Sequence, residues 1–276
     1  MKIELDGVPE TLLWNLHHRA AEARRPDTIL HDPRAVALVD AIDFPFLERF
    51  GPATHAQWQA LRALRFDAAV RAFLARHPQA TVAALGEGLE TQFWRVDNRA
   101  VRWLSVDLPE VIQLRAALLP PDSPRQSSFA GSALDPAWMD IPNPAHGLLI
   151  VAQGLLMYFQ PAAVHRLIAT CAQRFPGASM LLDGVPPWFS RRTLSGRLET
   201  REGYRTPPMP WSLDNAEIAR PRALHPNISQ LLRLPPARGR GWFHAFLSPL
   251  LQRTPGLRNL PLAGLPAIEI RFRPAA

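Results

Sequence analysis

Residues 82–91 read VAALGEGLET, so an apolar run passes directly into two glycines. Continuous apolar runs of this length are typical of strands that are buried on both faces of a parallel sheet. Glycines after such a strand let the backbone approach a ligand closely, in the crevice where the strand order of a doubly wound sheet reverses. Glycine pairs also form ordinary tight turns, so this stretch needs support from elsewhere in the chain.

That support comes from Asp107, which lies nineteen residues after Gly88 and directly follows the apolar stretch 101–106. An acidic residue at the end of the second strand can accept hydrogen bonds from both ribose hydroxyls of a nucleoside. A dinucleotide site would also need a third glycine, where this chain has Thr91. The spacing therefore predicts a nucleoside site without a pyrophosphate.

Around this stretch the pattern alternates between strands and helices, an order that builds a parallel sheet. We expect helical segments over 8–40 and 54–77 before the first strand. Strands are then expected at 81–85, 101–106, 128–130, 148–152 and 179–183, helices at 109–119 and 161–174, and a last edge strand at 267–272. The chain of 276 residues is long enough for one such α/β domain, so we expect a single core.

The composition is that of an ordinary globular protein, with 47% hydrophobic and 20% charged residues. The N-terminus has no apolar signal region, and no stretch approaches the roughly 18 apolar residues of a membrane span. We therefore expect a cytoplasmic protein without membrane contact. Cys171 is the only cysteine, which excludes an internal disulfide and a cysteine metal cluster and favours a small buried apolar residue.

The net charge of +7 comes from an excess of arginine near the C-terminus, where residues 191–276 hold 14 Arg and 5 acids. Such a surface could attract nucleic acid or an anionic substrate. The arginines are scattered among prolines, tryptophans and leucines, which favours a solvated face over a nucleic-acid surface.

Eight segments carry further motifs, at 8–13, 19–20, 32–35, 62–67, 85–95, 106–111, 132–140 and 154–159. The most specific are DLPEV at 107–111 and GLLMY at 154–158. In this order they resemble the class I methyltransferases grouped with leucine carboxyl methyltransferase and the tetracenomycin-type polyketide O-methyltransferases. The resemblance covers about residues 5–185.

The resemblance implies a Rossmann-like α/β fold, with a mostly parallel seven-stranded sheet, helices on both faces, and S-adenosyl-L-methionine as cofactor. The product of the cofactor would be S-adenosyl-L-homocysteine. We divide the single domain into an N-terminal helical cap at 1–78, a cofactor-binding core at 79–183, a lid or insertion at 184–245 and C-terminal strands at 246–276. The lid is inferred from clustered prolines and tryptophans, which line a pocket or anchor a long loop equally well.

The resemblance also implies which residues bind the nucleoside part of the cofactor. Asp107 with Leu108 would hold the ribose. The adenine, a planar ring suited to an apolar slot with a few polar groups, would be bordered by Ser132, Ala133 and Leu134.

A second set would bind the methionine part. Gly86, Glu87 and Gly88 would face it, and Arg62 would pair with its carboxylate, a task that suits the fork of a guanidinium. Gln153 would accept a hydrogen bond from its amine.

Three positions depart from the family pattern. Gln153 stands where an acid is common, Gln92 where an arginine is common, and Ser105 where an acid often precedes Asp107. Gln153 keeps a hydrogen-bond acceptor but loses the charge attraction for the amine. The departures therefore leave open a weaker cofactor affinity or an altered pocket.

On the acceptor side the sequence identifies no catalytic base. A carboxylate acceptor needs orientation more than a base, whereas a hydroxyl acceptor could use His17, His18 or His165. No metal site is predicted, because adjacent histidines cannot face one way on a helix. Candidate acceptor-binding residues, which core packing explains about as well, are Trp14, Met157, Tyr158, Trp188 and Phe189.

Three functions remain open at this point. The first is a small-molecule O-methyltransferase, acting on a carboxylate or hydroxyl of a polyketide-like or other secondary metabolite. The second is a protein carboxyl methyltransferase, and the third a non-catalytic or regulatory module that kept the fold. Nucleic acid is a disfavoured partner, because residues 153–156 read QGLL where base methyltransferases carry a polar-aromatic tetrapeptide. A monomer and a homodimer are both compatible with the sequence.

Overall fold

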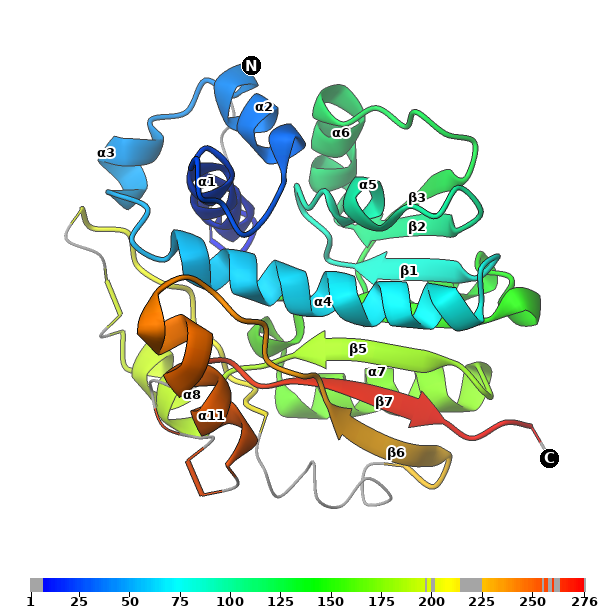
Figure 1. The fold of residues 1–276 in the computed structure, drawn as a ribbon. Helices are drawn as coiled ribbons and strands as arrows, with labels where there is room; N and C mark the ends of the chain where they lie inside the picture. The colour runs from blue at the N-terminus through cyan, green and yellow to red at the C-terminus, as the bar shows by residue number, and fades with distance from the viewer. Residues whose placement is uncertain are drawn as a thin grey trace.

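The computed structural model describes residues 7–196, 198–199, 202–213, 225–254, 256–257, 260 and 264–275. In this part of the chain a seven-stranded sheet is flanked by helices (Figure 1). The strands are β1 Thr81–Leu85, β2 Arg102–Asp107, β3 Gln126–Ala130, β4 Leu148–Ala152, β5 Ser179–Asp183, β6 Ile228–Arg233 and β7 Ala267–Phe272.

Proline sets the start of several helices, because its fixed φ suits the first helical position and its missing N–H is not needed there. It does so in α2, where the Asp32 side chain also accepts the N–H of Ala35. The helices are α1 Thr11–Ala23, α2 Pro33–Ala41, α3 Phe46–Phe50, α4 Ala56–Arg76, α5 Gln92–Val96, α6 Pro109–Leu118, α7 Pro161–Arg174, α8 Pro187–Leu194 and α11 Ser248–Arg253.

The strand order is β3-β2-β1-β4-β5-β7-β6. The first five strands in this order are parallel, whereas β7 is antiparallel to both β5 and β6. The prediction of a mostly parallel seven-stranded sheet is confirmed. The chain order reverses between β1 and β4, which opens a crevice at the carboxyl ends of these strands.

Helices cover both faces of the sheet, as predicted. Strand side chains alternate between the faces, so Ala83 of β1 packs with α7 residues such as Ile168, while Val82 packs with Phe66 of α4. Cys171 of α7 is fully buried, in agreement with its prediction as a small core residue. Every residue of β1, β4 and β5 is buried, which explains their continuous apolar sequences.

The region beyond β5 differs from the prediction. The strand at 267–272, expected at the sheet edge, is the interior strand β7, because β6 pairs along its outer side. β6 lies inside the segment 184–245 that we expected to be a lid, and only Ile228 of it is fully buried, so its apolar signal is weak. The segment 246–276 contains α11 as well as β7. Parts of the expected lid, including 214–224, lie outside the described residues, and the lid stays a prediction.

The expected helical stretch at 8–40 is two helices, because the Asp32-Pro33 pair starts α2 afresh. Together with α3 they lie beyond the carboxyl ends of the strands (Figure 1). Leu13 and Leu16 of α1 share a buried cluster with Leu89, which follows β1. The N-terminal helices therefore cover the crevice. Within the described residues, no helix combines the length and the apolar character that crossing a membrane requires.

Candidate active site

The glycine turn after β1 is held directly by Asp107 at the end of β2. The Gly88 N–H donates to one carboxylate oxygen at 2.7 Å, and the Leu108 N–H donates to the other at 2.8 Å. Gly86 and Gly88 both adopt positive φ, 59° and 55°, a conformation that favours glycine. Burial raises the pKa of Asp107, and the two backbone N–H groups oppose this shift. Each oxygen keeps lone-pair capacity for a ligand hydroxyl.

The segment predicted to border adenine lies beside this carboxylate. Asp107 pairs with Ala130 in the parallel register of β2 and β3, and Gly131 donates its N–H to the Asp107 carbonyl at 2.8 Å. Leu134 is 39% exposed and Leu108 is 37% exposed. These side chains provide an apolar surface that suits a flat ring, next to a carboxylate that suits a ribose. The residues predicted to border the adenine therefore follow the strand that pairs with Asp107. Ser132 Oγ accepts a hydrogen bond from the Leu134 N–H, and Ala133 is buried.

Arg62 and Gln153 line one cavity together with Gly86, Gly88 and Gly154. Arg62 Nη2 is buried, and no residue of the described chain accepts its hydrogens. Gln153 Oε1 is also buried, and none of the described groups donates to it. A cationic donor and a neutral acceptor in one cavity match the carboxylate and ammonium groups of an amino acid. The residues present therefore fit the methionine end of S-adenosylmethionine.

This cavity has a volume of about 80 Å³. Sites that hold whole small molecules have volumes of roughly 300 Å³ or more. Thr11, Leu12 and Asn15 of α1 form its outer wall, whereas Asp107 and Leu134 do not line it. The cavity is therefore sized for the amino-acid end of the ligand. The residues predicted to hold the ribose and to border the adenine, Asp107 and Leu134, lie outside it.

Glu87 lines the cavity together with Gly86 and Gly88, and its carboxylate also makes contacts within the protein. Its carboxylate accepts hydrogen bonds from Ser105 Oγ at 2.5 Å and from Trp103 Nε1 at 3.1 Å, and it lies 3.1 Å from Arg115 Nη2. These contacts hold the Glu87 carboxylate, so Glu87 also positions the glycine turn. The departure at Ser105 has a structural reason, because its hydroxyl supplies one of these hydrogen bonds.

Sequence reasoning missed a buried ionic network beneath the glycine turn. Arg95 contacts Asp67 at 2.8 Å, Glu90 at 2.7 Å and Asp32 at 3.0 Å. Gln92 donates to Asp67 at 3.0 Å, so the positive charge that this position lacks is supplied by Arg95. Burial favours the neutral form of Glu90, but nearby arginines outweigh it and lower its pKa to about 2. The three acids that contact Arg95 are spread over 58 positions of the sequence, so no local pattern predicts this cluster.

Four of the five predicted acceptor residues gather near the end of β5. Met157 is buried with Val185 and Met209, and Tyr158 and Phe189 pack against them; we call these five residues the Met157 cluster. The ring centroids of Trp188 and Phe189 lie 5.4 Å apart. The buried Nε1 of Trp188 has no hydrogen-bond partner among the described groups.

Trp14 lies elsewhere, against the rings of His18 at 4.2 Å and His55 at 5.9 Å. His18 Nδ1 lies 2.9 Å from the Trp14 carbonyl, while His17 Nε2 lies 3.0 Å from the Gly51 carbonyl. Burial lowers the pKa of His18 to about 4, although the carbonyl contact opposes it. A neutral imidazole of this kind is a weak base at pH 7.

These observations first define a class. A mostly parallel sheet has a carboxylate and a glycine turn at its reversal point, beside a cavity lined by a guanidinium and an amide. This arrangement suits S-adenosylmethionine, the cofactor of methyltransferases with a Rossmann-like fold. A Thermobifida fusca protein, solved as a candidate methyltransferase, has this fold with a TM-score of 0.54 at 19% identity, over 97% of this chain and 99% of its own.

Sequence comparison then identifies the family. The profile of the leucine carboxyl methyltransferase family matches residues 13–172, and the chain belongs to that family. It is 33% identical over 190 residues to the tetracenomycin polyketide synthesis O-methyltransferase TcmP of Streptomyces glaucescens, across 68% of this chain and 70% of TcmP. It is 27% identical over 192 residues to the S-adenosyl-L-methionine-dependent methyltransferase dpfgK of Gibberella zeae, across 63% of each chain. The chain is an S-adenosylmethionine-dependent methyltransferase.

Proposed function

We propose that the chain transfers a methyl group to an oxygen of a small molecule, a carboxylate or a hydroxyl of a polyketide-like or other secondary metabolite. The observation that carries the proposal is the pair of buried, complementary groups, Arg62 Nη2 and Gln153 Oε1, in one cavity with the glycine turn. When bound, S-adenosylmethionine supplies a methyl group on a sulfonium, which an acceptor oxygen takes with release of S-adenosylhomocysteine.

The chain contributes binding and orientation. Arg62 and Gln153 would hold the carboxylate and ammonium of the cofactor, and Asp107 would accept hydrogen bonds from its ribose hydroxyls. Leu108 and Leu134, both exposed, would hold its adenine. Fixing both reactants in line provides much of the rate enhancement of such a displacement, without a metal or a strong base.

The acceptor is bound by an apolar surface. The Met157 cluster lies where the loops after β4 and β5 meet, close to Arg62, whose charge acts on the Tyr158 hydroxyl. Methionine and aromatic side chains adapt to the apolar bodies of small metabolites. The named activity of the Streptomyces glaucescens relative supports transfer to oxygen in polyketide synthesis. We place the protein in the cytoplasm as a monomer or homodimer that binds no nucleic acid.

A calorimetric titration with two ligands tests the cofactor site. S-adenosylhomocysteine carries the amino-acid end, whereas 5′-methylthioadenosine lacks it. We expect a dissociation constant on the order of micromolar for S-adenosylhomocysteine, about −8 kcal/mol. Arg62→Gln should weaken this ligand at least tenfold and leave 5′-methylthioadenosine unchanged. If both ligands weaken equally, Arg62 only supports the fold; if neither ligand binds the unaltered protein, the proposed function fails.

A methyl-transfer assay tests the acceptor. The protein is incubated with S-adenosylmethionine and a panel of phenols, aromatic carboxylic acids and peptides with a free C-terminus, and products are identified by mass spectrometry. Methyl ethers or small-molecule esters support the proposal. Methylation of peptides alone would identify a protein carboxyl methyltransferase instead.

A further inference from the structure

The cavity that holds Arg62 and Gln153, which we call the cofactor cavity, offers the ammonium group of a ligand no charge at position 153. Gln153 Oε1 accepts a hydrogen bond but is neutral. A cation held in a partly closed cavity without a negative charge nearby is unfavourable. The cofactor cavity has a volume of only about 80 Å³, so every group that lines it lies close to a ligand there. Among its described lining residues, the acidic ones are Glu87 and Glu90.

The two carboxylates differ in their charge. Burial raises the pKa of Glu87, whose carboxylate already accepts hydrogen bonds from two neighbouring side chains. Burial acts on Glu90 in the same direction, but the charges of Arg19 and Arg95 outweigh it and lower the pKa of Glu90 to about 2. Glu90 therefore carries a negative charge throughout the physiological pH range.

One oxygen of the Glu90 carboxylate remains available to a ligand. Arg95 Nη1 and the Thr91 N–H donate to Oε1 at 2.7 Å and 2.8 Å, and Arg19 also contacts Oε1. No group in the described part of the chain donates a hydrogen bond to Oε2. The Glu90 side chain is 15% exposed and lines the cofactor cavity, so Oε2 can accept a hydrogen bond from a ligand there.

The charges around Glu90 also favour a bound cation. The buried network contains two arginines and three carboxylates, namely Arg19, Arg95, Asp32, Asp67 and Glu90. Arg71 lies 4.0 Å from Asp67, but its side chain is 52% exposed and its charge is screened by water. The buried groups therefore have one negative charge in excess, and a cation bound beside them lowers the cost of that excess.

The charge of Glu90 acts across the cofactor cavity. Against the effect of burial, the charges of Asp183 and, more weakly, Glu90 raise the pKa of Arg62. The carboxylate and ammonium of an amino acid are attached to one carbon atom. A ligand whose carboxylate pairs with Arg62 therefore brings its ammonium close to Glu90.

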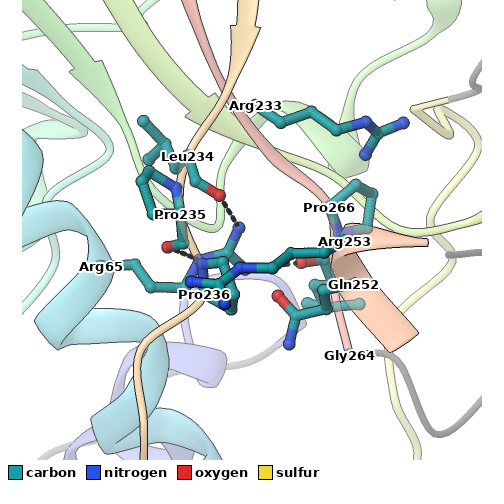
Figure 2. Close-up of a pocket in the computed structure, with 10 residues that line it drawn as sticks. Arg65, Arg233, Leu234, Pro235, Pro236, Gln252, Arg253, Gly264 and Pro266 are labelled. Carbon is teal, nitrogen blue, oxygen red and sulfur yellow. Dashed lines mark hydrogen bonds between the residues drawn. The ribbon is translucent and has the colours of Figure 1, made fainter. Parts of the chain in front are cut away.

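Arg65, one helical turn after Arg62 on α4, does not contribute to this balance. It lines a separate cavity between α4, β6 and α11, which shares no lining residue with the cofactor cavity (Figure 2). The Arg65 guanidinium donates there to three backbone carbonyls, those of Leu265 at 3.0 Å, Leu234 at 2.9 Å and Pro235 at 3.2 Å. Of the two arginines, Arg62 lines the cofactor cavity and Arg65 does not.

We propose that Glu90 Oε2 binds the ammonium group of the cofactor together with Gln153 Oε1, and supplies the negative charge that position 153 lacks. This inference rests on the proposed function and adds a binding residue to its cofactor site. In this chain the charge stands in the turn after β1 instead of at the end of β4, and these two strands are neighbours in the sheet.

Calorimetry with three ligands tests the charge. S-adenosylhomocysteine carries ammonium and carboxylate, 5′-S-(3-carboxypropyl)-5′-thioadenosine is its deaminated analogue, and 5′-methylthioadenosine lacks both groups. The unaltered protein should bind S-adenosylhomocysteine about 10- to 100-fold more tightly than the deaminated analogue, the difference expected for a hydrogen bond between charged groups. Equal binding of these two ligands overturns the proposal.

Glu90→Gln tests the residue. It should weaken S-adenosylhomocysteine about tenfold or more and leave the other two ligands within about twofold, because they have no ammonium group. Glu48→Gln, at an exposed glutamate of α3, makes the same change and should leave all three within about twofold. If Glu90→Gln weakens all three ligands equally, Glu90 only supports the fold and the proposal fails.

A charge placed at position 153 separates binding from folding. Gln153→Glu combined with Glu90→Gln should restore S-adenosylhomocysteine affinity to within about threefold of the unaltered protein, whereas it cannot repair the network. Gln153→Glu alone adds a charge to a site that already has one, so its gain should stay below about threefold. No recovery in the double variant, or a gain of about tenfold in the single one, contradicts the role of Glu90. If the unaltered protein binds none of the three ligands, the proposed function itself fails, and this inference with it.

Discussion

The Asp183 carboxylate at the end of β5 holds the Arg62 guanidinium by an Nε to Oδ2 hydrogen bond of 2.5 Å. The other carboxylate oxygen accepts the N–H of Gly154 at 2.7 Å. Burial alone would lower the pKa of Arg62, but the charge and hydrogen bond of Asp183 outweigh it and raise that pKa. Asp183 therefore sets the direction of the charged group that we assign to the cofactor carboxylate.

Gly154→Ala should displace this guanidinium. Gly154 has a φ of 74°, and a Cβ there would lie too close to Arg62 Nη2 for van der Waals contact. We expect a loss of about 1–2 kcal/mol in unfolding free energy from backbone strain, together with weaker S-adenosylhomocysteine binding. Gly196→Ala is the matched control, since its φ is 69° and nothing lies within 4 Å of a new Cβ. Urea unfolding and calorimetry measure both effects; equal cofactor affinity in the two variants would contradict the contact.

Asp107→Asn should weaken S-adenosylhomocysteine and 5′-methylthioadenosine alike, by about 10- to 100-fold, because hydrogen bonds to a charged group contribute about 1.5–3 kcal/mol. Both ligands carry the ribose that Asp107 is proposed to hold. Asp140→Asn, at an exposed carboxylate paired with Arg174, controls for the charge change. Unchanged binding of both ligands to Asp107→Asn would show that the ribose lies elsewhere.

Stability should fall as the pH drops from about 6.5 to about 4, because of buried histidine. His18 is 1% exposed, and its pKa of about 4 in the folded protein lies below its ordinary value of 6.5. In this window the unfolded chain binds a proton that the folded chain does not, which costs on the order of 3 kcal/mol. Burial lowers the pKa of His17 and His55 in the same direction. Urea midpoints of His18→Gln should depend less on pH, whereas the exposed His146→Gln should follow the unaltered protein.

Arg95→Met should be among the most destabilising single changes in the core. Removing this charge leaves Asp32, Asp67 and Glu90 buried without their shared partner, and breaking a buried ionic network costs about 3–5 kcal/mol. The exposed pair of Arg174 and Asp140 provides the control, because Arg174→Met should cost less than about 1 kcal/mol. Equal losses in the two variants, measured by urea unfolding, would mean that the network does not stabilise the fold.

The core of the fold was predictable because each of its central strands is a short, continuous apolar run in the sequence. The apolar runs at β1, β4 and β5 are buried on both faces, and each is completed within five residues. β6 was not predicted, because it is an edge strand with one fully buried residue and therefore has a weak apolar pattern. It also lies among prolines. Its pairing with β7 comes from contacts between segments about 40 residues apart, and no local pattern reports those.

The same distinction applies to the site. Asp107 and the glycine turn were predictable, because parallel strands bring their carboxyl ends to one edge whatever else the chain does. Asp183 gives the same signal, an acid at the end of a buried strand, and could have been found by it. The contacts of Glu87 could not, because Arg115, Ser105 and Trp103 reach it from other elements.

By itself, the sequence determined the positions of the parallel core strands, the class of ligand and the residues at the strand ends. These depend on periodicity and on spacing along one segment of chain. Only the tertiary structure decided that Arg95 supplies the charge missing at Gln92, that α1 closes the amino-acid end of the site, and that Glu90 lines the same cavity as Gln153. Side-chain contacts between distant segments depend on how the elements pack together, and no periodic pattern in the sequence predicts that packing.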